Sequence, residues 1–378
     1  MDSKDEKYMQ MALKLAEKGI GAVEPNPAVG AVVVKASQIV GKGWHKKFGQ
    51  PHAEVNALED CKSLGVNPEG ATMYVTLEPC CQEGKTGPCT DAIIQAKIAR
   101  VVAATIDPSE HASGKGIEQL RSANIEVQTG TCETDARLLN APFIKYATSG
   151  KCWVILKWAQ SIDGKLAWAD SQTNRWISSE QSRKDVQKLR RRSQAILVGV
   201  NTVIADDPKL TVRPPKDQSP TRIVLDNHLK LPLGCRLLRT AGKVPVLIYT
   251  AEETLQSNQQ KVQKLESKGA ELLAHPQLPE TSNLQFLLEQ LSSRGIQQLL
   301  VEGGAKVITS FLQQHLADEV CVYIAPKILG SCGKVDMSES LANLERHIGL
   351  HYTDIKSFDG DIRLSGLTKD ALKEISVT

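Results

Sequence analysis

The chain has little of what a membrane protein or a nucleic-acid-binding protein needs. No apolar run is long enough to span a bilayer, and the charged segment Met1–Lys7 has no apolar core of signal-peptide length. Aromatic residues make up only 4% of the chain, which leaves few rings on which successive bases could stack. We therefore expect a cytoplasmic protein with neither a membrane nor a nucleic acid as partner.

The chain also lacks a strong excess of one charge, and its number of cysteines is odd. The formal net charge is +3 without a basic tract, and this mild balance suits a small anionic substrate. Nine cysteines are an odd number in a reducing compartment, so metal ligation or burial is a better expectation than disulfides. Three of them, Cys80, Cys81 and Cys89, lie close together in the sequence.

The length indicates two domains. A chain of 378 residues, of which 41% are hydrophobic, exceeds what one core usually serves. We expect a first domain at residues 1–147 and a second at residues 151–378, joined by a short linker at Thr148–Gly150. No internal repeat points to a repeat fold.

Hydrophobic periodicity predicts an α/β fold for both domains. In the first domain we expect helices at Lys4–Lys18, His52–Cys61, Cys89–Lys97, Lys115–Ser122 and Glu133–Tyr146, and strands at Ala28–Val34, Gln38–Trp44, Ala71–Leu77, Val101–Thr105 and Ile125–Val127. In the second we expect strands at Trp153–Trp158, Ala195–Val200, Thr221–Asp226, Val244–Tyr249, Gln297–Glu302 and Glu319–Ala325, helices that include Ser179–Arg192 and Leu284–Arg294, and a surface loop at Thr211–Ser219.

One group of residues in the first domain has the composition of a hydrolytic zinc site. His52, Cys80 and Cys89 supply one imidazole and two thiolates, and Glu54 adds a carboxylate two residues after the histidine. Three protein ligands leave the fourth tetrahedral position to water, whose pKa zinc lowers to about 7. Glu54 is then the expected catalytic residue, because it can move a proton from that water to the leaving amine.

Two other interpretations of this group stay open. The histidine could merely begin a helix while the cysteines are buried as small apolar residues. A purely structural zinc site would need a fourth protein ligand, and Cys81 is the candidate for it.

The motifs around this group resemble the deaminase half of the bifunctional riboflavin biosynthesis proteins. They are Asn26–Gly30, Gly43–His45, Pro51–Glu54, Thr76–Cys80 and Gly84–Cys89. Deaminases that edit nucleic acids usually place the two cysteines as P-C-x-x-C, whereas Glu83 stands at that second position here. The resemblance implies a cytidine-deaminase-like domain of α/β/α layers.

The same resemblance implies the substrate contacts of the first domain. Asn26 would contact the pyrimidine, and His45 and Lys85 would lie near the ribose phosphate. Gln82 stands where the family usually has a histidine that contacts substrate, so we expect a working deaminase with a raised KM. Taken alone, Asn26 could be only a turn residue before a proline and Lys85 only a solvated side chain.

The second domain lacks the G-x-G-x-x-G motif of common dinucleotide sites. Instead, Gly303 and Gly304 follow an expected strand and precede an expected helix, where the backbone could approach a phosphate. By itself such a turn is weak evidence, since most glycine pairs only punctuate loops.

The motifs around that turn resemble, in order, the reductase half of the same bifunctional family, whose fold is similar to dihydrofolate reductase. They are Ser161–Lys165, Trp176–Ser178, Arg190, Thr202–Pro208, Leu210, Arg213, Glu302–Gly304 and Tyr323–Gly330. The resemblance implies NADPH contacts at Gln160, Trp176, Thr202, Asp206, Gly303, Gly304, Ala305 and Lys306. It implies substrate contacts at Lys157, Asn174, Arg190, Leu210, Arg213 and Glu302.

Some of these residues have simpler interpretations. Arg190, Arg191 and Arg192 could form a solvated helix end, and Asp206 with Asp207 could form only a turn before Pro208. The segment Gln172–Asn174 and Gln160 also depart from the usual family pattern, so the cofactor pocket could be altered.

The resemblance as a whole implies an enzyme of riboflavin biosynthesis that uses Zn²⁺ and NADPH. It would deaminate 2,5-diamino-6-(5-phosphoribosylamino)pyrimidin-4-one to 5-amino-6-(5-phosphoribosylamino)uracil, and then reduce the ribosyl group to ribityl. We also expect a homo-oligomer. The alternatives are a nucleic-acid-editing zinc deaminase and a chain in which one half is only a scaffold.

Overall fold

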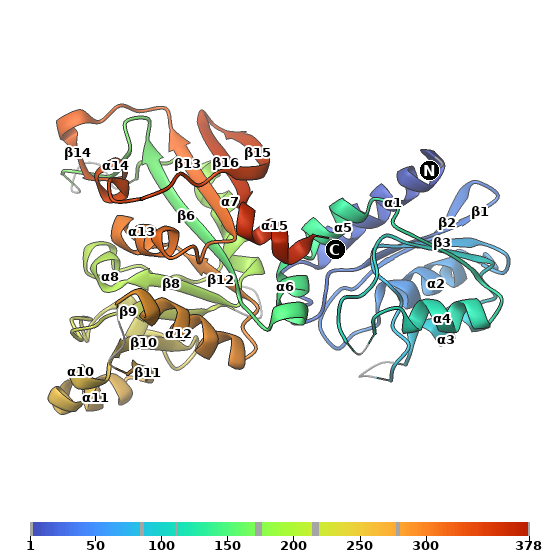
Figure 1. Cartoon of the computed structure of the whole chain (residues 1–378), viewed down its shortest axis with the longest axis horizontal. Coiled ribbons are helices and arrows are strands. Elements are labelled where there is room, and N and C mark those ends of the chain that lie inside the picture. The colour runs from blue at the N-terminus through green and yellow to red at the C-terminus, as the bar shows by residue number, and fades with distance from the viewer. Residues whose placement is uncertain are drawn as a thin grey trace. The chain divides into compact units, whose positions relative to one another are not determined.

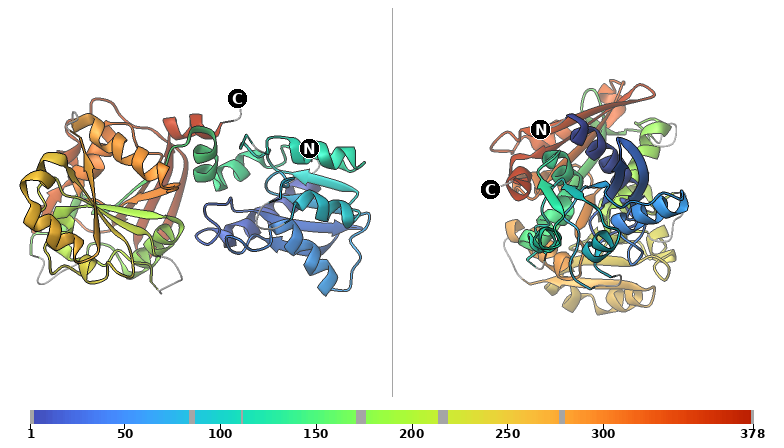
Figure 2. Two further views of the ribbon diagram at one scale, coloured as in Figure 1. Left: turned by 90° about the horizontal axis from the view of Figure 1, so that it is seen from below. Right: turned by 90° about the vertical axis from the view of Figure 1, so that its right-hand side faces the viewer.

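The computed structural model describes residues 3–83, 87–110, 112–170, 176–213, 219–276 and 280–376. Two compact units divide the chain, at residues 1–150 and 151–378. In Figures 1 and 2 the strands of each unit fan into its own twisted sheet. No helix in the described part of the chain is both long and apolar enough to cross a membrane.

The first unit is built on a five-stranded sheet with the order β2-β1-β3-β4-β5. Strand β1 is antiparallel to β2 and β3, whereas β3, β4 and β5 are parallel to one another. The strands are β1 (Gly30–Lys35), β2 (Gln38–Trp44), β3 (Thr72–Val75), β4 (Arg100–Ala103) and β5 (Glu126–Thr129). The helices are α1 (Ser3–Ala16), α2 (Ala53–Ser63), α3 (Cys89–Gln95), α4 (Lys115–Ser122), α5 (Glu133–Leu139) and α6 (Ala141–Ser149), and a 3₁₀ turn η1 (Glu17–Gly19) follows α1.

Helices cover both faces of this sheet, because β1 is apolar on both faces. Ala31 and Val33 pack into a core with residues of α2 and α3, while Val32 and Val34 pack into a second core with residues of α1. This arrangement has the three α/β/α layers that the family resemblance implies.

Two glycines of β2 let α2 lie directly on the sheet. A Cβ atom at Gly41 would stand 2.3 Å from the carbonyl oxygen of Ala57, and one at Gly43 would stand 2.2 Å from that of Ala53. No side chain fits at such distances. The close approach fixes the N-terminus of α2, where His52 and Glu54 lie.

The second unit is built on a nine-stranded sheet with the order β11-β10-β9-β8-β12-β6-β13-β16-β15, and β7 pairs with β14 separately. Its strands are β6 (Trp153–Ser161), β7 (Lys165–Trp168), β8 (Ala195–Gly199), β9 (Thr221–Leu225), β10 (Val246–Ala251), β11 (Ala270–His275), β12 (Gln298–Val301), β13 (Glu319–Ala325), β14 (Gly333–Asp336), β15 (Leu350–Phe358) and β16 (Asp361–Thr368). Its helices are α7 (Glu180–Arg192), α8 (Val200–Asp206), α9 (Arg236–Arg239), α10 (Glu252–Ser257), α11 (Gln259–Glu266), α12 (Glu280–Ser293), α13 (Ala305–Gln313), α14 (Met337–Leu341) and α15 (Lys369–Ile375), and a 3₁₀ turn η2 (Gly330–Cys332) precedes β14.

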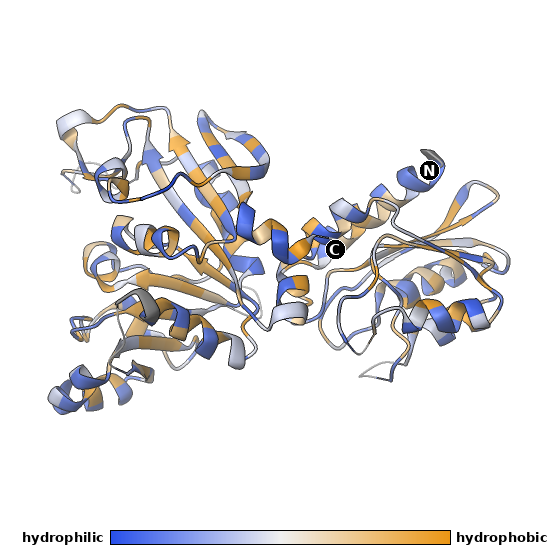
Figure 3. Ribbon diagram, viewed as in Figure 1, coloured by the Kyte–Doolittle hydropathy of each residue, from blue (hydrophilic) through white to orange (hydrophobic). Residues whose placement is uncertain are grey.

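The strands from β11 to β13 are all parallel, and β16 and β15 add an antiparallel hairpin at one edge. Figure 3 shows the central strands β8 and β12 as mainly hydrophobic and the outer helices α10 and α11 as mainly hydrophilic. Strands buried on both faces give near-continuous apolar runs, which is why the sequence indicates them well.

Candidate active sites

The three expected zinc ligands converge in the first unit. The Nδ1 atom of His52 lies 3.5 Å from the sulfur of Cys80 and 3.3 Å from that of Cys89. All three ligand atoms lie within 4.8 Å of one another. Cys81, the candidate fourth ligand, is not part of this group among the described residues.

Local structure explains why these ligands meet. His52 is the N-cap of α2, Cys89 is the first residue of α3, and Cys80 follows the carboxyl end of β3. The backbone N–H of Cys89 points to the sulfur of Cys80 at 3.5 Å. Because helix N-termini stabilise negative charge, this arrangement favours thiolates.

The electrostatics of the group fit a cation held by sulfur and nitrogen. The hydrogen bond from Cys89 and that from His52 lower the pKa of Cys80 to about 4. The same bonds raise the pKa of Cys89 and, from the Cys80 side, that of His52. One imidazole beside two sulfurs, with a thiolate already favoured, is a donor set that zinc prefers.

Glu54 lies beside the ligands and is only 3% exposed. Burial, together with the negative charge of Cys80, raises the pKa of the Glu54 carboxyl to about 7. A carboxyl group with a pKa near neutrality can both accept and release a proton, as the expected role requires.

His45 and Asn26 stand in a hydrogen-bonded line next to the ligands. The Nδ1 atom of His45 is 3.2 Å from the carbonyl oxygen of Pro51, and its Nε2 atom is 3.4 Å from the amide nitrogen of Asn26. The rings of His45 and His52 meet edge to face, with centroids 5.1 Å apart. Burial lowers the pKa of His45 and so favours the neutral ring. A carbonyl oxygen only accepts hydrogen bonds, so Nδ1 is the ring nitrogen that donates to Pro51.

The Pro51 carbonyl, which only accepts, determines which groups donate and which accept in the line from Pro51 through His45 to Asn26. Since Nδ1 of His45 carries the proton, Nε2 is an acceptor and the amide nitrogen of Asn26 donates to it. The amide oxygen of Asn26 is thereby left to accept a hydrogen bond from another group. Gln82 is exposed near Cys80, whereas Lys85 lies outside the described residues.

Sequence reasoning assigned no role to Glu78, which holds the Cys80 segment in place. Its carboxylate is 4% exposed and accepts backbone N–H bonds from Asp107, Gly114, Gly116 and Ile117 at 2.9 to 3.2 Å. These bonds tie the residues before Cys80 to the start of α4. The only signal in the sequence was the position of Glu78 two residues before a ligand.

Asn140 was missed in the same way. Its side-chain amide donates to the carbonyl oxygen of Ala28 at 2.9 Å and accepts from the Ala28 N–H at 2.8 Å. These two hydrogen bonds imitate the pairing of adjacent strands. They fix the loop that carries Asn26. It also corrects one expectation, because the predicted helix Glu133–Tyr146 is two helices, α5 and α6, that break at Asn140.

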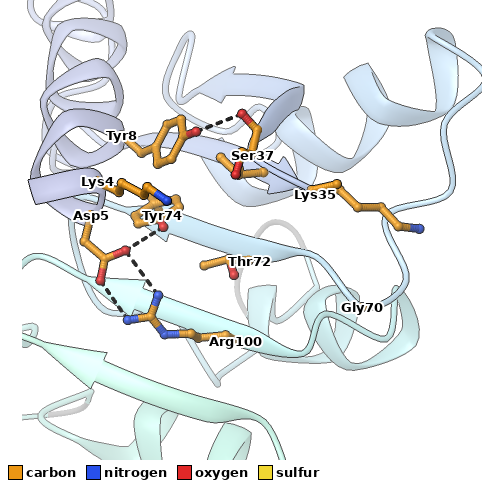
Figure 4. A pocket seen from close by; sticks show the side chains of 11 residues that line it. Lys4, Asp5, Tyr8, Lys35, Ser37, Gly70, Thr72, Tyr74 and Arg100 are labelled. Carbon is orange, nitrogen blue, oxygen red and sulfur yellow. Dashed lines mark hydrogen bonds and ion pairs between the residues drawn. The ribbon is translucent and has the colours of Figure 1, made fainter. Parts of the chain in front are cut away.

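A hollow of about 230 Å³ lies at the opposite end of β3 from Cys80. Figure 4 shows the Asp5 carboxylate between Arg100 and Tyr74, and the Tyr8 hydroxyl donating to the carbonyl of Ser37. Asp5 and Arg100 form an ion pair there, and Arg100 also contacts Glu126 at 3.2 Å. We interpret the hydrogen bonds and ion pairs that line this hollow as structural contacts that hold α1 against the sheet.

In the second unit, three of the expected substrate contacts form a charged cluster. Arg190 of α7 meets Glu302 with two bonds of 2.7 and 2.8 Å, and both side chains are almost buried. Lys157 of β6 lies beside them, with its Nζ atom 5.6 Å from the centre of the Tyr323 ring. Arg190 is therefore not part of a solvated helix end.

The three side chains of this cluster shift one another's pKa values. Burial would raise the pKa of Glu302, but the Arg190 guanidinium outweighs it and Lys157 adds to the effect, so the pKa falls to about 2. Burial lowers the pKa of Lys157, which Glu302 partly offsets. Glu302 is thus ionised at neutral pH, and Lys157 is the group here that releases a proton more readily than usual.

Gln160, one of the expected cofactor contacts, lies on the other face of the sheet. Leu156 of β6 packs into the core with α12 and α13, so Trp158 and Gln160 share that face, while Lys157 faces α7. Gly304 is the N-cap of α13, and a Cβ atom on it would lie 3.7 Å from the Thr202 hydroxyl. Ala305 is buried and Lys306 is exposed in the first turn of that helix.

The remaining expected contacts are more dispersed. Trp176 is 53% exposed, with the guanidinium of Arg183 5.0 Å from its ring centre. Asp206 ends α8, and Leu210 is buried with a positive φ of 50°. Arg213 is exposed and its backbone N–H donates to Gln187 at 2.9 Å. Asn174 lies outside the described residues.

Asp163 is a further residue whose role sequence reasoning missed. Its carboxylate accepts from the Ser161 hydroxyl and from the backbone N–H groups of Leu329 and Gly330 at 2.6 to 3.0 Å. These bonds join the ends of β6 and β13 and explain why two motifs far apart in sequence occur together.

Two family models match the chain. One, described as the cytidine and deoxycytidylate deaminase zinc-binding region, matches residues 2–105, and the other, the RibD C-terminal domain, matches residues 152–363. The riboflavin biosynthesis protein RibD of Aquifex aeolicus is 49% identical over 86% of this chain and 88% of its own length.

Solved structures give the same picture. Form 1 of RibD from Acinetobacter baumannii is similar with a TM-score of 0.80 and 37% identity, covering 97% of this chain and 99% of its own. A deaminase/reductase from Thermotoga maritima is similar with a TM-score of 0.79 and 36% identity, with the same coverage.

Fold and sites together define a two-domain enzyme, a zinc-binding deaminase domain of the cytidine deaminase type followed by a reductase domain. The chain belongs to the RibD family of riboflavin biosynthesis proteins. It is a bifunctional deaminase and reductase, as the sequence motifs predict.

Proposed function

We propose that the first unit deaminates 2,5-diamino-6-(5-phosphoribosylamino)pyrimidin-4-one with Zn²⁺, and that the second reduces the ribosyl group of the product with NADPH. The observation that carries this proposal is the meeting of His52, Cys80 and Cys89 beside the buried carboxyl of Glu54. The chain's similarity to the Thermotoga maritima protein, a diaminohydroxyphosphoribosylaminopyrimidine deaminase/5-amino-6-(5-phosphoribosylamino)uracil reductase, supports it.

His52, Cys80 and Cys89 would hold the zinc ion. When bound, zinc supplies a Lewis acid that makes water a nucleophile at neutral pH. Glu54 takes a proton from the attacking water and passes it to the departing amino group. The ring carbon exchanges its amine for an oxygen, and ammonia leaves.

Asn26 orients the pyrimidine in this proposal. Because its amide nitrogen is engaged with Nε2 of His45, its amide oxygen faces the substrate as an acceptor. A ring N–H or amino group of the diaminopyrimidine is the complementary donor. Gln82 and Lys85 are assigned to the phosphoribosyl end by the same resemblance.

In the second unit the opened ribosylamine presents a C=N bond. NADPH supplies the hydride that adds to the sugar carbon. Lys157 gives the proton to the nitrogen, because Glu302 is ionised and keeps its bonds to Arg190. Arg213, which is exposed and whose guanidinium is a bidentate donor, is better placed for the phosphate than Arg190.

The remaining assignments follow the family resemblance. Gln160, Trp176, Thr202, Asp206 and the Gly303–Lys306 turn would bind NADPH, and Asn174 and Leu210 the substrate. A cytoplasmic location and a homo-oligomer stay predictions.

A crossed pair of variants tests the two roles. Glu54→Gln should abolish ammonia release, by at least about 100-fold, because it removes the proton carrier, and should leave NADPH oxidation with the deaminated compound unchanged. Lys157→Met should do the reverse, because Lys157 is the proton donor proposed for the second unit. Zinc content and thermal unfolding of each variant serve as controls.

Two outcomes would contradict the proposal. One is Glu54→Gln protein that still releases ammonia at the wild-type rate. The other is wild-type protein that gives only one of the two signals, which would favour the alternative that one half is a scaffold.

A further inference from the structure

One hydrogen bond in the second unit fixes the direction of a side-chain amide. The indole Nε1 atom of Trp158 lies 2.7 Å from the Oε1 atom of Gln160, two residues further along β6. Indole N–H is only a donor, so the amide oxygen of Gln160 must be the acceptor. The NH₂ group of Gln160 therefore points away from Trp158.

Trp158 is itself held in place by packing. It lies against the core that α12 and α13 form with the central strands. Its ring therefore has little freedom to turn. Because the Gln160 amide is hydrogen-bonded to this ring, its orientation is restricted as well. Among the described residues, no protein group accepts a hydrogen bond from the Gln160 NH₂ group, and the side chain is half-buried.

The position of Gln160 on β6 indicates which part of a bound dinucleotide could accept a hydrogen bond from its NH₂ group. A phosphate would lie at the N-terminus of α13, at Gly304. Val301, the last residue of β12, is level with Leu156, so Gln160 lies four residues, about 13 Å, further along β6. Lys157, the group placed at the reacting bond, points to the opposite face of β6. In the described part of the chain, however, the pairing of β6 with β12 ends at Leu156 while β6 continues to Ser161, so a ring beside this open edge can meet both side chains.

We propose that Trp158 is a positioning residue for the cofactor, because it locks Gln160 so that its NH₂ group donates to a carbonyl oxygen of the nicotinamide half of NADPH. This inference rests on the proposed function and adds a residue and a polarity to it. A nicotinamide carries one amide carbonyl, which is the acceptor that such a donor complements.

Direct binding to the full chain tests the proposal without turnover. NADPH titrated into Gln160→Ala, Trp158→Phe and the double variant reports three dissociation constants. Each single variant should raise the NADPH constant about 3- to 10-fold, the range for one neutral hydrogen bond. The double variant should be no weaker than Gln160→Ala, because Trp158 acts through Gln160.

A second ligand separates the two halves of the cofactor. Adenosine 2′,5′-bisphosphate lacks the nicotinamide, so its binding should be unchanged in all three variants. Gln285→Ala, an exposed glutamine of α12, is the matched control and should bind NADPH as the wild type does. Gln160→Glu, which keeps an acceptor for the indole but presents no N–H, should bind NADPH more weakly than Gln160→Ala.

Three results would overturn the proposal: unchanged NADPH binding in Gln160→Ala, additive effects of the two substitutions, or an equal loss of adenosine 2′,5′-bisphosphate binding. A failure of the proposed function has a different signature, since wild-type protein would then not bind NADPH at all. Thermal unfolding of each variant shows whether the fold is retained.

Discussion

Three buried carboxylates, Glu54, Glu302 and Asp5, differ in what surrounds the charge. Among the described residues no lysine or arginine forms an ion pair with Glu54, and burial raises its pKa. Glu302 and Asp5 each face an arginine, and their pKa values fall. The first kind suits proton transfer, whereas the second kind holds a fixed charge and supports the structure.

Asp5 gives a test of the second kind. The hydrogen bonds from Arg100 and Tyr74 outweigh burial and lower its pKa, so its stabilising effect is present above its unfolded pKa and is lost as the pH falls through the folded value. Asp5→Asn should reduce the free energy of unfolding of the first unit by about 1–3 kcal/mol at pH 7. Urea unfolding should show this difference shrinking below about pH 4.

Glu126→Gln is the matched control, because Glu126 contacts the same arginine from an exposed position. Its effect should stay below about 1 kcal/mol. An Asp5→Asn effect that is the same at every pH, or no larger than that of the control, would contradict this account.

At the residue scale, the sequence is most informative where chemistry needs particular residue types. The group of His52, Glu54, Cys80 and Cys89 could be predicted because imidazole, thiolates and carboxylate are rarely spaced in this way by chance. Glu78 and Asn140 could not be predicted, since each acts through backbone groups that only the folded chain brings near. Trp158 acts through a side-chain bond that the spacing of two residues on a strand permits but does not reveal.

Among the elements, the break between α5 and α6 links the end of the first unit to the loop that carries Asn26. At this break, the side chain of Asn140 is hydrogen-bonded to both the N–H and the carbonyl oxygen of Ala28. The loop that carries Asn26 is therefore held from a segment more than a hundred residues later in the sequence.

Asn140→Ala should loosen that loop. We expect the KM for the diaminopyrimidine to rise about 10-fold, the cost of one or two lost hydrogen bonds, with zinc content unchanged. Steady-state ammonia release and metal analysis measure the two quantities. Asn67→Ala, on an exposed loop, is the control. Loss of zinc from the Asn140 variant, or an unchanged KM, would show that the bond does not act on the loop.

Strands and helices were predicted best where burial is continuous, as in β6, β8 and β12. The strands β7, β11 and β14 and the hairpin of β15 and β16 were not predicted. Residues of β15 are mostly exposed and polar, so neither an apolar run nor a regular alternation marks it. Its pairing with β16 depends on contacts that local sequence does not encode.

At the scale of the whole molecule, each unit has its own sheet, its own core and its own site. The proposed zinc ligands all lie within residues 1–150, and the Lys157, Arg190 and Glu302 cluster lies within residues 151–378. The two reactions therefore draw on separate sets of side chains. Removing the metal should affect only one of them.

Chelation of the metal tests this central claim most directly. Protein treated with a zinc chelator should lose ammonia release from the diaminopyrimidine substrate, while NADPH oxidation with the deaminated compound continues at the untreated rate, and added Zn²⁺ should restore ammonia release. If ammonia release persists in protein shown to be free of metal, or if NADPH oxidation falls in parallel with it, the assignment of two independent sites is wrong.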